Sequence, residues 1–271
     1  MLSDVLIVAR PDRAPRIECA GGVAARRTDA DTVHLVSAAA TPLGGDTIRV
    51  RVVVEPGARL RVRSVAATMA MPGTASMESR SSWDLEVAGL LDLDPQPTIV
   101  AGLARHVTTT ALTLTGDGCA RVRERVQIGR SYERQGFWSG AMRADVDGTP
   151  LLRHRVDMGN GSVTDDELGT PMAYVSELRY PEASFEAEGP VLRLAAGGAV
   201  ATWQGDRLIG RPGQDWPRRW EALDRHPSIV CPAPGVDGVL QRHAERVAEP
   251  DHRAEARAGH SADLDLAQRL G

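Results

Sequence analysis

The chain has 271 residues, a net charge of −4 and no lysine, so all 32 of its basic residues are arginines. The length suits one large domain or two small ones, and the slightly acidic balance argues against the basic surface that nucleic-acid binding requires. The absence of lysine excludes Schiff-base and lysine-base mechanisms.

Cysteine content and the length of apolar runs indicate the cellular compartment of the protein. The three cysteines are odd in number and far apart, which favours a reducing environment over a disulfide framework. The first residues lack the basic region and apolar core of a signal peptide, and no apolar run approaches the ~18 residues of a membrane span. We therefore expect a soluble, cytoplasmic protein without a membrane partner.

Residues 48–63 carry a strong alternating pattern. Every second residue from Ile48 to Val54 is apolar, and after Pro56-Gly57 the alternation resumes with Leu60 and Val62 between arginines. Period two predicts strands, and Pro-Gly predicts a turn that pairs the two runs as a hairpin. We interpret the arginines as a solvated sheet face; a docking surface for an acidic partner is the alternative.

The same arrangement of strand, tight turn and strand recurs along the chain. Further turns are expected at 88–89, 116–118 and 147–148, at roughly 30-residue intervals, and another strand pair surrounds Gly197-Gly198. This spacing is typical of layered or solenoid-like sheets. The predicted fold class is mainly β, with layered or solenoid-like antiparallel hairpins and a few short C-terminal helices.

Helical spacing of apolar residues is found only near the end, at 217–226 and 236–249. The residues after Pro250 are polar and offer few apolar anchors. We predict a β-rich domain at 1–235 and a helical, polar appendage at 236–271 that is partly flexible.

Catalytic motifs are not found in the sequence. It contains no nucleophile elbow, zinc-protease helix, P-loop or CxxC pair. Carboxylates such as Glu124, Glu133 and Asp145 leave open a pair for general acid–base chemistry, as in a carbohydrate hydrolase on a β fold. The aromatic content of 4% is low for a sugar-binding groove, so an enzyme is the less favoured interpretation.

Histidines and cysteines offer few metal ligands. Histidines in strand-like runs are expected to be hydrogen-bonded or exposed residues and not metal ligands: His34, His106 and His154. Near the C-terminal end, imidazole and thiolate groups suit nickel, copper or zinc, but their spacing matches no closed zinc site. Weak metal candidates there are His226, Cys231 and His243. We expect no tightly bound cofactor, with transient nickel contact left open.

Several short motifs, taken in order over roughly residues 16–180, resemble the UreD (UreH) family of urease accessory proteins. Gly44-Gly45-Asp46 precedes a strand, Pro56-Gly57-Ala58 forms a turn, and "SVAATM" ends at Thr68-Met69, where the family has a threonine-lysine step. A glutamate, a Gly-Arg pair and a second glutamate follow in family order. The candidates for family-motif or partner-binding roles are Gly44, Gly45, Asp46, Thr68, Glu124, Gly129, Arg130, Glu133 and Gly136. Methionine in place of the family lysine leaves open a divergent paralogue.

The resemblance implies a largely β, solenoid-like protein that is not an enzyme. It further implies that the protein binds apo-urease and recruits UreF-type and UreG-type accessory proteins for nickel insertion into the urease active site. The alternative functions are a divergent nickel-binding or protein-binding β module that is not linked to urease, and the carbohydrate hydrolase described above.

Overall fold

The computed structural model describes residues 1–163 and 170–208, which contain only strands, turns and loops. The mainly β, solenoid-like fold expected from the sequence is therefore confirmed. The predicted C-terminal helices, the domain boundary at residue 235 and the appendage at 236–271 lie outside the described residues. The described strands are β1 Leu2–Ala9, β2 Arg16–Ala20, β3 Val23–Arg27, β4 Thr32–Ser37, β5 Thr47–Val54, β6 Arg59–Ser64, β7 Thr68–Ala70, β8 Glu78–Val87, β9 Leu90–Leu93, β10 Thr98–Val100, β11 Arg105–Leu114, β12 Cys119–Ile128, β13 Phe137–Val146, β14 Thr149–Gly159, β15 Ala173–Tyr180, β16 Val191–Arg193 and β17 Ala199–Gly205.

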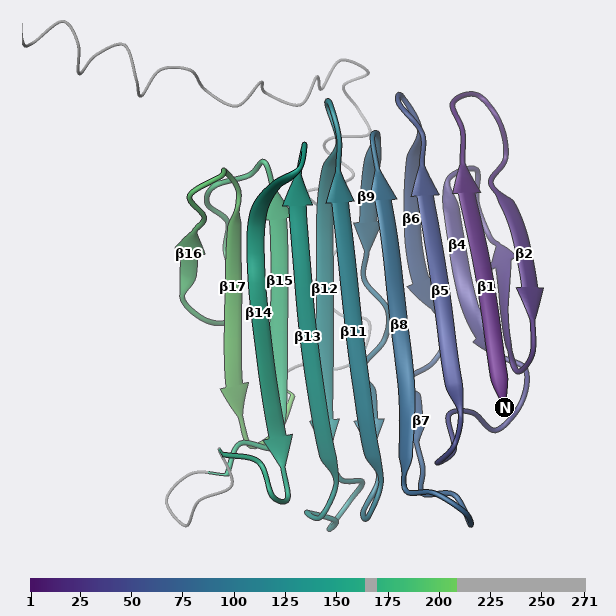
Figure 1. Cartoon of the computed structure of the whole chain (residues 1–271), viewed down its shortest axis with the longest axis vertical. Helices are drawn as coiled ribbons and strands as arrows, with labels where there is room; N and C mark the ends of the chain where they lie inside the picture. Colours follow the sequence, from purple (N-terminus) through teal and green to yellow (C-terminus); the bar gives the residue numbers. More distant parts are fainter. Residues whose placement is uncertain (164–169, 209–271) are drawn as a thin grey trace, which may run out of the picture. The chain divides into compact units, whose positions relative to one another are not determined.

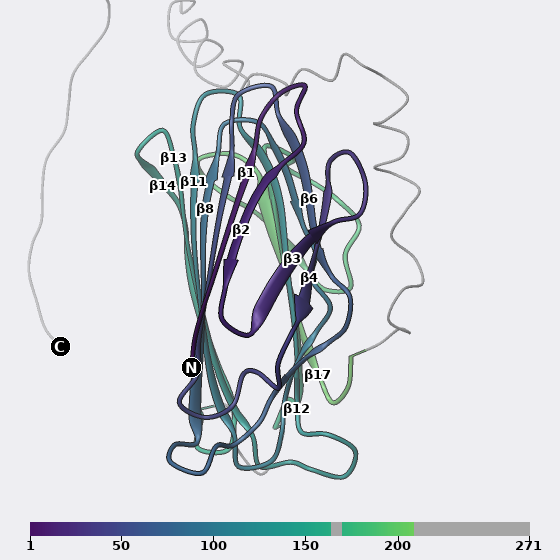
Figure 2. The ribbon, with the colours of Figure 1, turned by 90° about the vertical axis from the view of Figure 1, so that its right-hand side faces the viewer.

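The strands form two sheets that lie face to face (Figures 1 and 2). The seven-stranded sheet has the order β14-β13-β11-β8-β5-β1-β2, and the ten-stranded sheet has the order β16-β17-β15-β12-β9-β6-β4-β3, with β10 beside β12 and β7 beside β10. Inside each sheet the central strands are parallel: β5 pairs with β1 and β8, and β6 pairs with β4 and β9.

This pairing corrects the predicted hairpin around Pro56-Gly57. The flanking strands β5 and β6 belong to different sheets, so the turn is an arch that carries the chain from one sheet to the other. The turns at 88–89 and 116–118 are arches as well, whereas those at 147–148 and 197–198 do join antiparallel hairpins. An alternating pattern indicates which side of a strand is buried. The pattern is the same in a hairpin and in an arch, so it cannot distinguish the two.

Stacking of successive arches accounts for the interval of roughly 30 residues. The amide of Ala88 donates to the carbonyl of Val54 at 2.8 Å, and that of Thr115 donates to Val87 at 3.0 Å. Each coil thus places its arch on the preceding one. The strand register repeats from one coil to the next: Val54 lies opposite Val87, and Leu114 lies opposite Val146.

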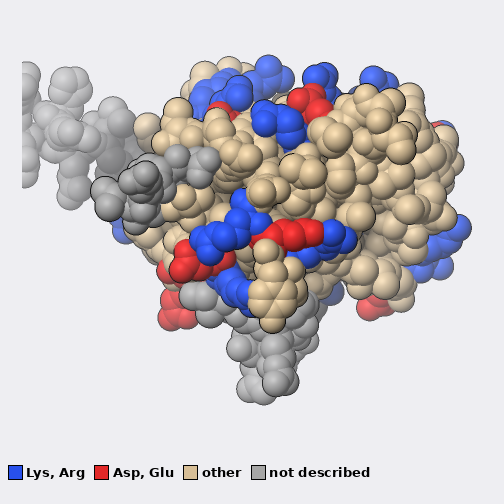
Figure 3. All heavy atoms as spheres, turned by 90° about the horizontal axis from the view of Figure 1, so that it is seen from below, with Lys and Arg blue, Asp and Glu red and all other residues tan. Residues whose placement is uncertain are grey.

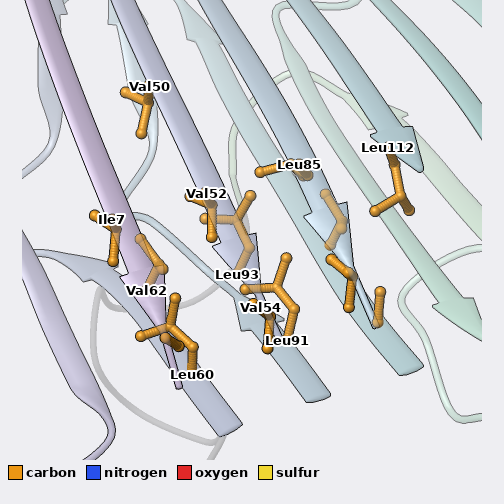
Figure 4. Packing of buried hydrophobic residues seen from close by; sticks show 14 of the residues in the cluster. Ile7, Val50, Val52, Val54, Leu60, Val62, Leu85, Leu91, Leu93 and Leu112 are labelled. Carbon is orange, nitrogen blue, oxygen red and sulfur yellow. The ribbon is translucent and has the colours of Figure 1, made fainter. Parts of the chain in front are cut away.

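The alternating apolar residues fill the space between the sheets. Ile48, Val50, Val52 and Val54 are all buried, and across the gap Leu60 and Val62 are at most 1% exposed. Figure 4 shows the side chains of Val50, Val52, Val54, Leu60 and Val62 in one layer with those of Leu85, Leu91, Leu93 and Leu112. Burial of this aliphatic layer is the main source of stability for the described unit. Arg49 and Arg51 on β5 and Arg59 on β6 are exposed, as a solvated face requires, whereas Arg61 and Arg63 on β6 are half-buried and pair with Asp31 and Asp92.

The described residues, 1–163 and 170–208, contain no helix of the length and hydropathy needed to cross a membrane.

Candidate functional site

A chamber with a mixed polar and apolar lining interrupts the apolar interior. One buried apolar cluster fills the space on the arch side, and a second, smaller cluster around Trp138 and Met158 lies toward the other end. Between them the inward positions of β11 and β8 change from leucine to hydroxyl and imidazole groups. A cavity of about 240 Å³ lies there, and its polar lining includes Ser64, Thr68, Thr98, His106, Thr108 and Glu124. Because exposed residues 65–67 also line it, the chamber reaches the surface at that segment.

Glu124 supplies the carboxylate of this chamber. Its neighbours two positions away on β12, Val122 and Val126, belong to the two apolar clusters, so alternation directs Glu124 into the same space between the sheets. Enclosure by protein raises the pKa of Glu124 to about 7, because burial penalises the charged form. The surface that it keeps faces the cavity. Near neutral pH this carboxylate therefore exists in both protonation states.

Arg123 and Arg125 also line the chamber, and its remaining polar groups are neutral donors and acceptors. His106 is 1% exposed, and its ring nitrogens lie 2.9 Å from Ser79 Oγ and 3.1 Å from Ser81 Oγ. Burial lowers the pKa of His106 to about 4, so the ring is uncharged at neutral pH. A cation in the chamber would meet one ionisable carboxylate, hydroxyl oxygens and an imidazole, and it would lie near Arg123 and Arg125, whose guanidinium groups pair with Glu177 and Asp94. Among the described residues no three His, Cys, Asp or Glu side chains cluster as a metal site.

Each of the three strand histidines has a hydrogen-bond partner, as expected. His34 Nδ1 lies 2.8 Å from Thr28 Oγ1, and His154 Nε2 lies 2.8 Å from the Tyr174 hydroxyl. His106 contacts the two serines described above. The weak metal candidates His226, Cys231 and His243 lie outside the described residues.

Most of the family-motif candidates lie together at the end of the unit opposite the arches. We call this the loop end and define it as residues 38–46, 71–77, 101–104 and 129–136. These loops lead into β5, β8, β11 and β13, which start side by side at the bottom of Figure 1. Backbone hydrogen bonds join them: Gly44 N donates to Met71 O at 2.9 Å, and Gly129 N donates to Val100 O at 2.7 Å.

Asp46 organises the first of these loops. Its carboxylate is buried and accepts hydrogen bonds from the Thr41 hydroxyl and the Leu43 amide, both at 2.9 Å, and from the Met1 amino group at 2.6 Å. Burial raises its pKa, but these donors outweigh that effect and hold the pKa below the ordinary value. Gly44 is required beside it, because an added Cβ would lie 1.7 Å from the Ser76 carbonyl oxygen.

Replacing Asp46 with Ala is expected to lower the free energy of unfolding by roughly 1–3 kcal/mol at pH 7, since three donors lose a charged acceptor. A depressed pKa contributes stability that is present above the ordinary value of 3.8 and lost as pH falls through the folded pKa. Urea unfolding at pH 7 and pH 3 should therefore show a difference between wild type and variant that shrinks at the lower pH. An equal difference at both values would contradict this role.

Glu133 joins two further loops. Its Oε2 accepts from the Gly102 amide at 2.8 Å and from the Arg130 amide at 3.1 Å, and the carboxylate pairs with the Arg130 guanidinium. These hydrogen bonds lower the pKa of Glu133 to about 2. Gly129 has a φ of +77°, and an added Cβ would lie 2.0 Å from the Glu133 carbonyl oxygen. The candidates Gly129, Arg130, Glu133 and Gly136 thus belong to one turn.

Thr68 and Met69 lie before the loop end, on the strand that leads into residues 71–77. Both are on the short strand β7, where Thr68 lines the chamber and Met69 pairs with Ile99 of β10. The sequence candidates therefore divide into two groups: Thr68 and Glu124 at the chamber, and the rest at the loop end.

A charged network on the outer face of the ten-stranded sheet was not predicted. Arg121 is 3% exposed, and it contacts Glu177 at 2.9 Å, Asp92 at 3.0 Å and Asp94 at 3.5 Å. Burial opposes the charge of Arg121, but the three carboxylates raise its pKa overall. The network extends through Arg63, Arg123, Arg125 and Arg179. In the sequence, arginines occupy every second position of one segment and aspartates occupy every second position of another. The sequence does not show that these side chains are buried.

The sequence of this two-sheet protein is similar to those of known proteins. Residues 23–175 match the family described as UreD urease accessory protein. The UreD 1 protein of Saccharopolyspora erythraea is 39% identical over 221 residues, covering 76% of this chain and 83% of that relative. UreD proteins of Frankia alni and Frankia casuarinae are 40% and 38% identical over 185 and 174 residues, which cover 67% and 58% of this chain. Those matches span only 58% and 54% of the two Frankia proteins.

The chain belongs to the UreD urease accessory protein family. The resemblance seen in the sequence is therefore confirmed, and membership supports a role in urease maturation.

Proposed function

We propose that this protein is a non-catalytic scaffold that binds apo-urease and recruits UreF-type and UreG-type proteins for nickel insertion into the urease active site. The observation that carries the proposal is the enclosed carboxylate of Glu124 in the chamber between the two sheets. Family membership supplies the context, and the loop end offers a surface for partners.

Nickel is the cargo in this proposal and is not a resident cofactor. An ion in transit needs oxygen or nitrogen ligands that hold it weakly, because a tight cage would stop its transfer. The chamber fits this requirement with the Glu124 carboxylate, the Thr68 and Thr108 hydroxyl groups and the uncharged His106 ring. A cation near Glu124 would favour the ionised carboxylate and lower its pKa from about 7.

The hydrolase alternative has no support in the geometry of the described residues. Glu124 faces the interior, Glu133 is held in a loop by Arg130, and Asp145 pairs with Arg153 at the surface of the other sheet. Acid–base catalysis on one bond requires two carboxyl groups within about 10 Å on either side of it, and these three groups are placed on different parts of the structure.

Co-expression tests the proposed scaffold. The full chain, carrying a tag, is expressed with the urease subunits and a UreF-type protein of the same organism, and the complex is analysed by gel filtration at micromolar concentration and several salt concentrations. We expect co-elution with both partners. Separate elution under all conditions would contradict the proposal, and a genome without urease genes beside this one would favour a divergent binding module.

A further inference from the structure

Two bulky apolar residues of the loop end have an unusual backbone conformation. Leu103 has a φ of +65° and Tyr132 a φ of +69°, a left-handed region that large side chains rarely adopt. Each occupies the third position of a four-residue turn, because Ala104 N donates to Ala101 O and Glu133 N donates to Arg130 O, both at 3.1 Å. Glycine is the usual residue at such a position. The sequence therefore retains strain at two places where glycine would remove it.

Both side chains point away from the protein. Tyr132 is 100% exposed and Leu103 is 61% exposed, so Tyr132 gains no stability from burial in the fold and Leu103 gains little. Two other exposed large apolar residues, Leu43 and Met77, belong to the same loop end. Backbone strain without burial is a cost that indicates a function outside the fold.

The two turns are fixed to each other by Glu133. Its carboxylate accepts from the Gly102 amide in the first turn and from the Arg130 amide in the second. The Arg130 guanidinium neutralises the same carboxylate. In the view of this end in Figure 3, basic and acidic side chains lie next to each other within a mostly uncharged surface. The loop end therefore presents two apolar points at a set separation with little net charge.

We propose that Leu103 and Tyr132 form a two-point apolar anchor that docks into apo-urease, an inference that rests on the proposed function. Urease is the protein named in the description of the family. A lipid surface accepts apolar side chains in any arrangement, whereas two residues fixed at the expense of backbone strain match a shaped protein surface. Aromatic anchors of this kind contribute most of the affinity at protein interfaces, and the internal ion pair makes the contact insensitive to salt.

Calorimetric titration of purified full chain with purified apo-urease of the same organism tests the anchor. We expect Tyr132→Ala to weaken binding by about 10- to 100-fold and Leu103→Ala to weaken it by about 10-fold, with the wild-type affinity nearly constant between low and high NaCl. Leu192→Ala is the matched control, because Leu192 is 60% exposed on β16, at the far edge of the ten-stranded sheet. That variant should bind as the wild type does.

Glycine variants separate docking from folding. Tyr132→Gly and Leu103→Gly remove the side chain and relieve the strained φ, so each should keep or raise the thermal midpoint while weakening binding. Variants that bind as tightly as the wild type would overturn the anchor and leave the scaffold role standing. A wild type that does not bind apo-urease would overturn both. Binding of the wild type to phosphatidylglycerol vesicles that Tyr132→Ala abolishes would assign the residues to a membrane and overturn the anchor.

Discussion

Replacing Arg121 with Ala is expected to lower the free energy of unfolding by about 3–5 kcal/mol. Its guanidinium lies between the carboxylates of Asp92, Asp94 and Glu177, and all of these groups are buried. Removal of the cation leaves three carboxylates close together with little access to water, which is the costly way to break a buried ion pair. The thermal midpoint should fall by roughly 10 °C.

An exposed arginine of the other sheet provides the control. Arg51 lies on the outer face of the seven-stranded sheet, where it pairs with Glu86 at 2.6 Å while both side chains remain accessible to solvent. Arg51→Ala should leave the midpoint unchanged within error, since solvent-exposed pairs contribute little. Urea unfolding of both variants beside the wild type measures the difference. Equal effects of the two substitutions would contradict a structural role for the buried network.

Replacing Glu124 with Gln is expected to stabilise the metal-free protein at pH 8 by roughly 1–3 kcal/mol and to reduce urease activation at least about 10-fold. Glutamine keeps the shape and removes a charge that is unfavourable in an enclosed chamber. Opposite effects on stability and function are typical of a residue kept for its chemistry. Urea unfolding and urease activity in co-expressing cells measure the two effects.

The pH dependence of stability gives a second test of Glu124. The pKa is about 7 in the folded protein and 4.5 for an ordinary glutamate. Between these values the unfolded chain has lost the proton that the folded chain keeps, so this group makes stability fall as pH rises through the window and leaves it constant above pH 7. The Glu124→Gln variant should not show this fall in stability, because glutamine does not titrate. An identical pH profile for wild type and variant would show that Glu124 is not enclosed.

The strands could be predicted from the sequence, but their pairing could not. Alternation placed Val50, Val52 and Val54 on a buried face, which is confirmed. The same alternation is required whether β5 continues into a hairpin or into an arch, because in both cases one face meets the core. Whether the chain forms a hairpin or an arch depends on the pairing of β5 with β1 and β8, and most of these contacts are between residues far apart in the sequence.

The candidate sites were predicted unevenly for a similar reason. The motif around Asp46 and the turn at residues 129–136 were identified through their resemblance to the UreD family, and the structure brings them to one end. The chamber was missed, because Glu124, a single glutamate between two valines on the inward face of its strand, gives no sign of the serine and His106 on the facing sheet. The strain at Leu103 and Tyr132 was also missed, since no sequence pattern reveals a left-handed backbone in a bulky residue.

The most direct test of the central claim is the nickel content of urease purified from cells that lack this gene. Urease protein should be present in normal amount and deficient in nickel. Complementation with the wild-type chain should restore the metal, and complementation with the Glu124→Gln variant should not. Fully metallated, active urease in the deletion strain at limiting nickel would contradict a role for this protein in urease maturation.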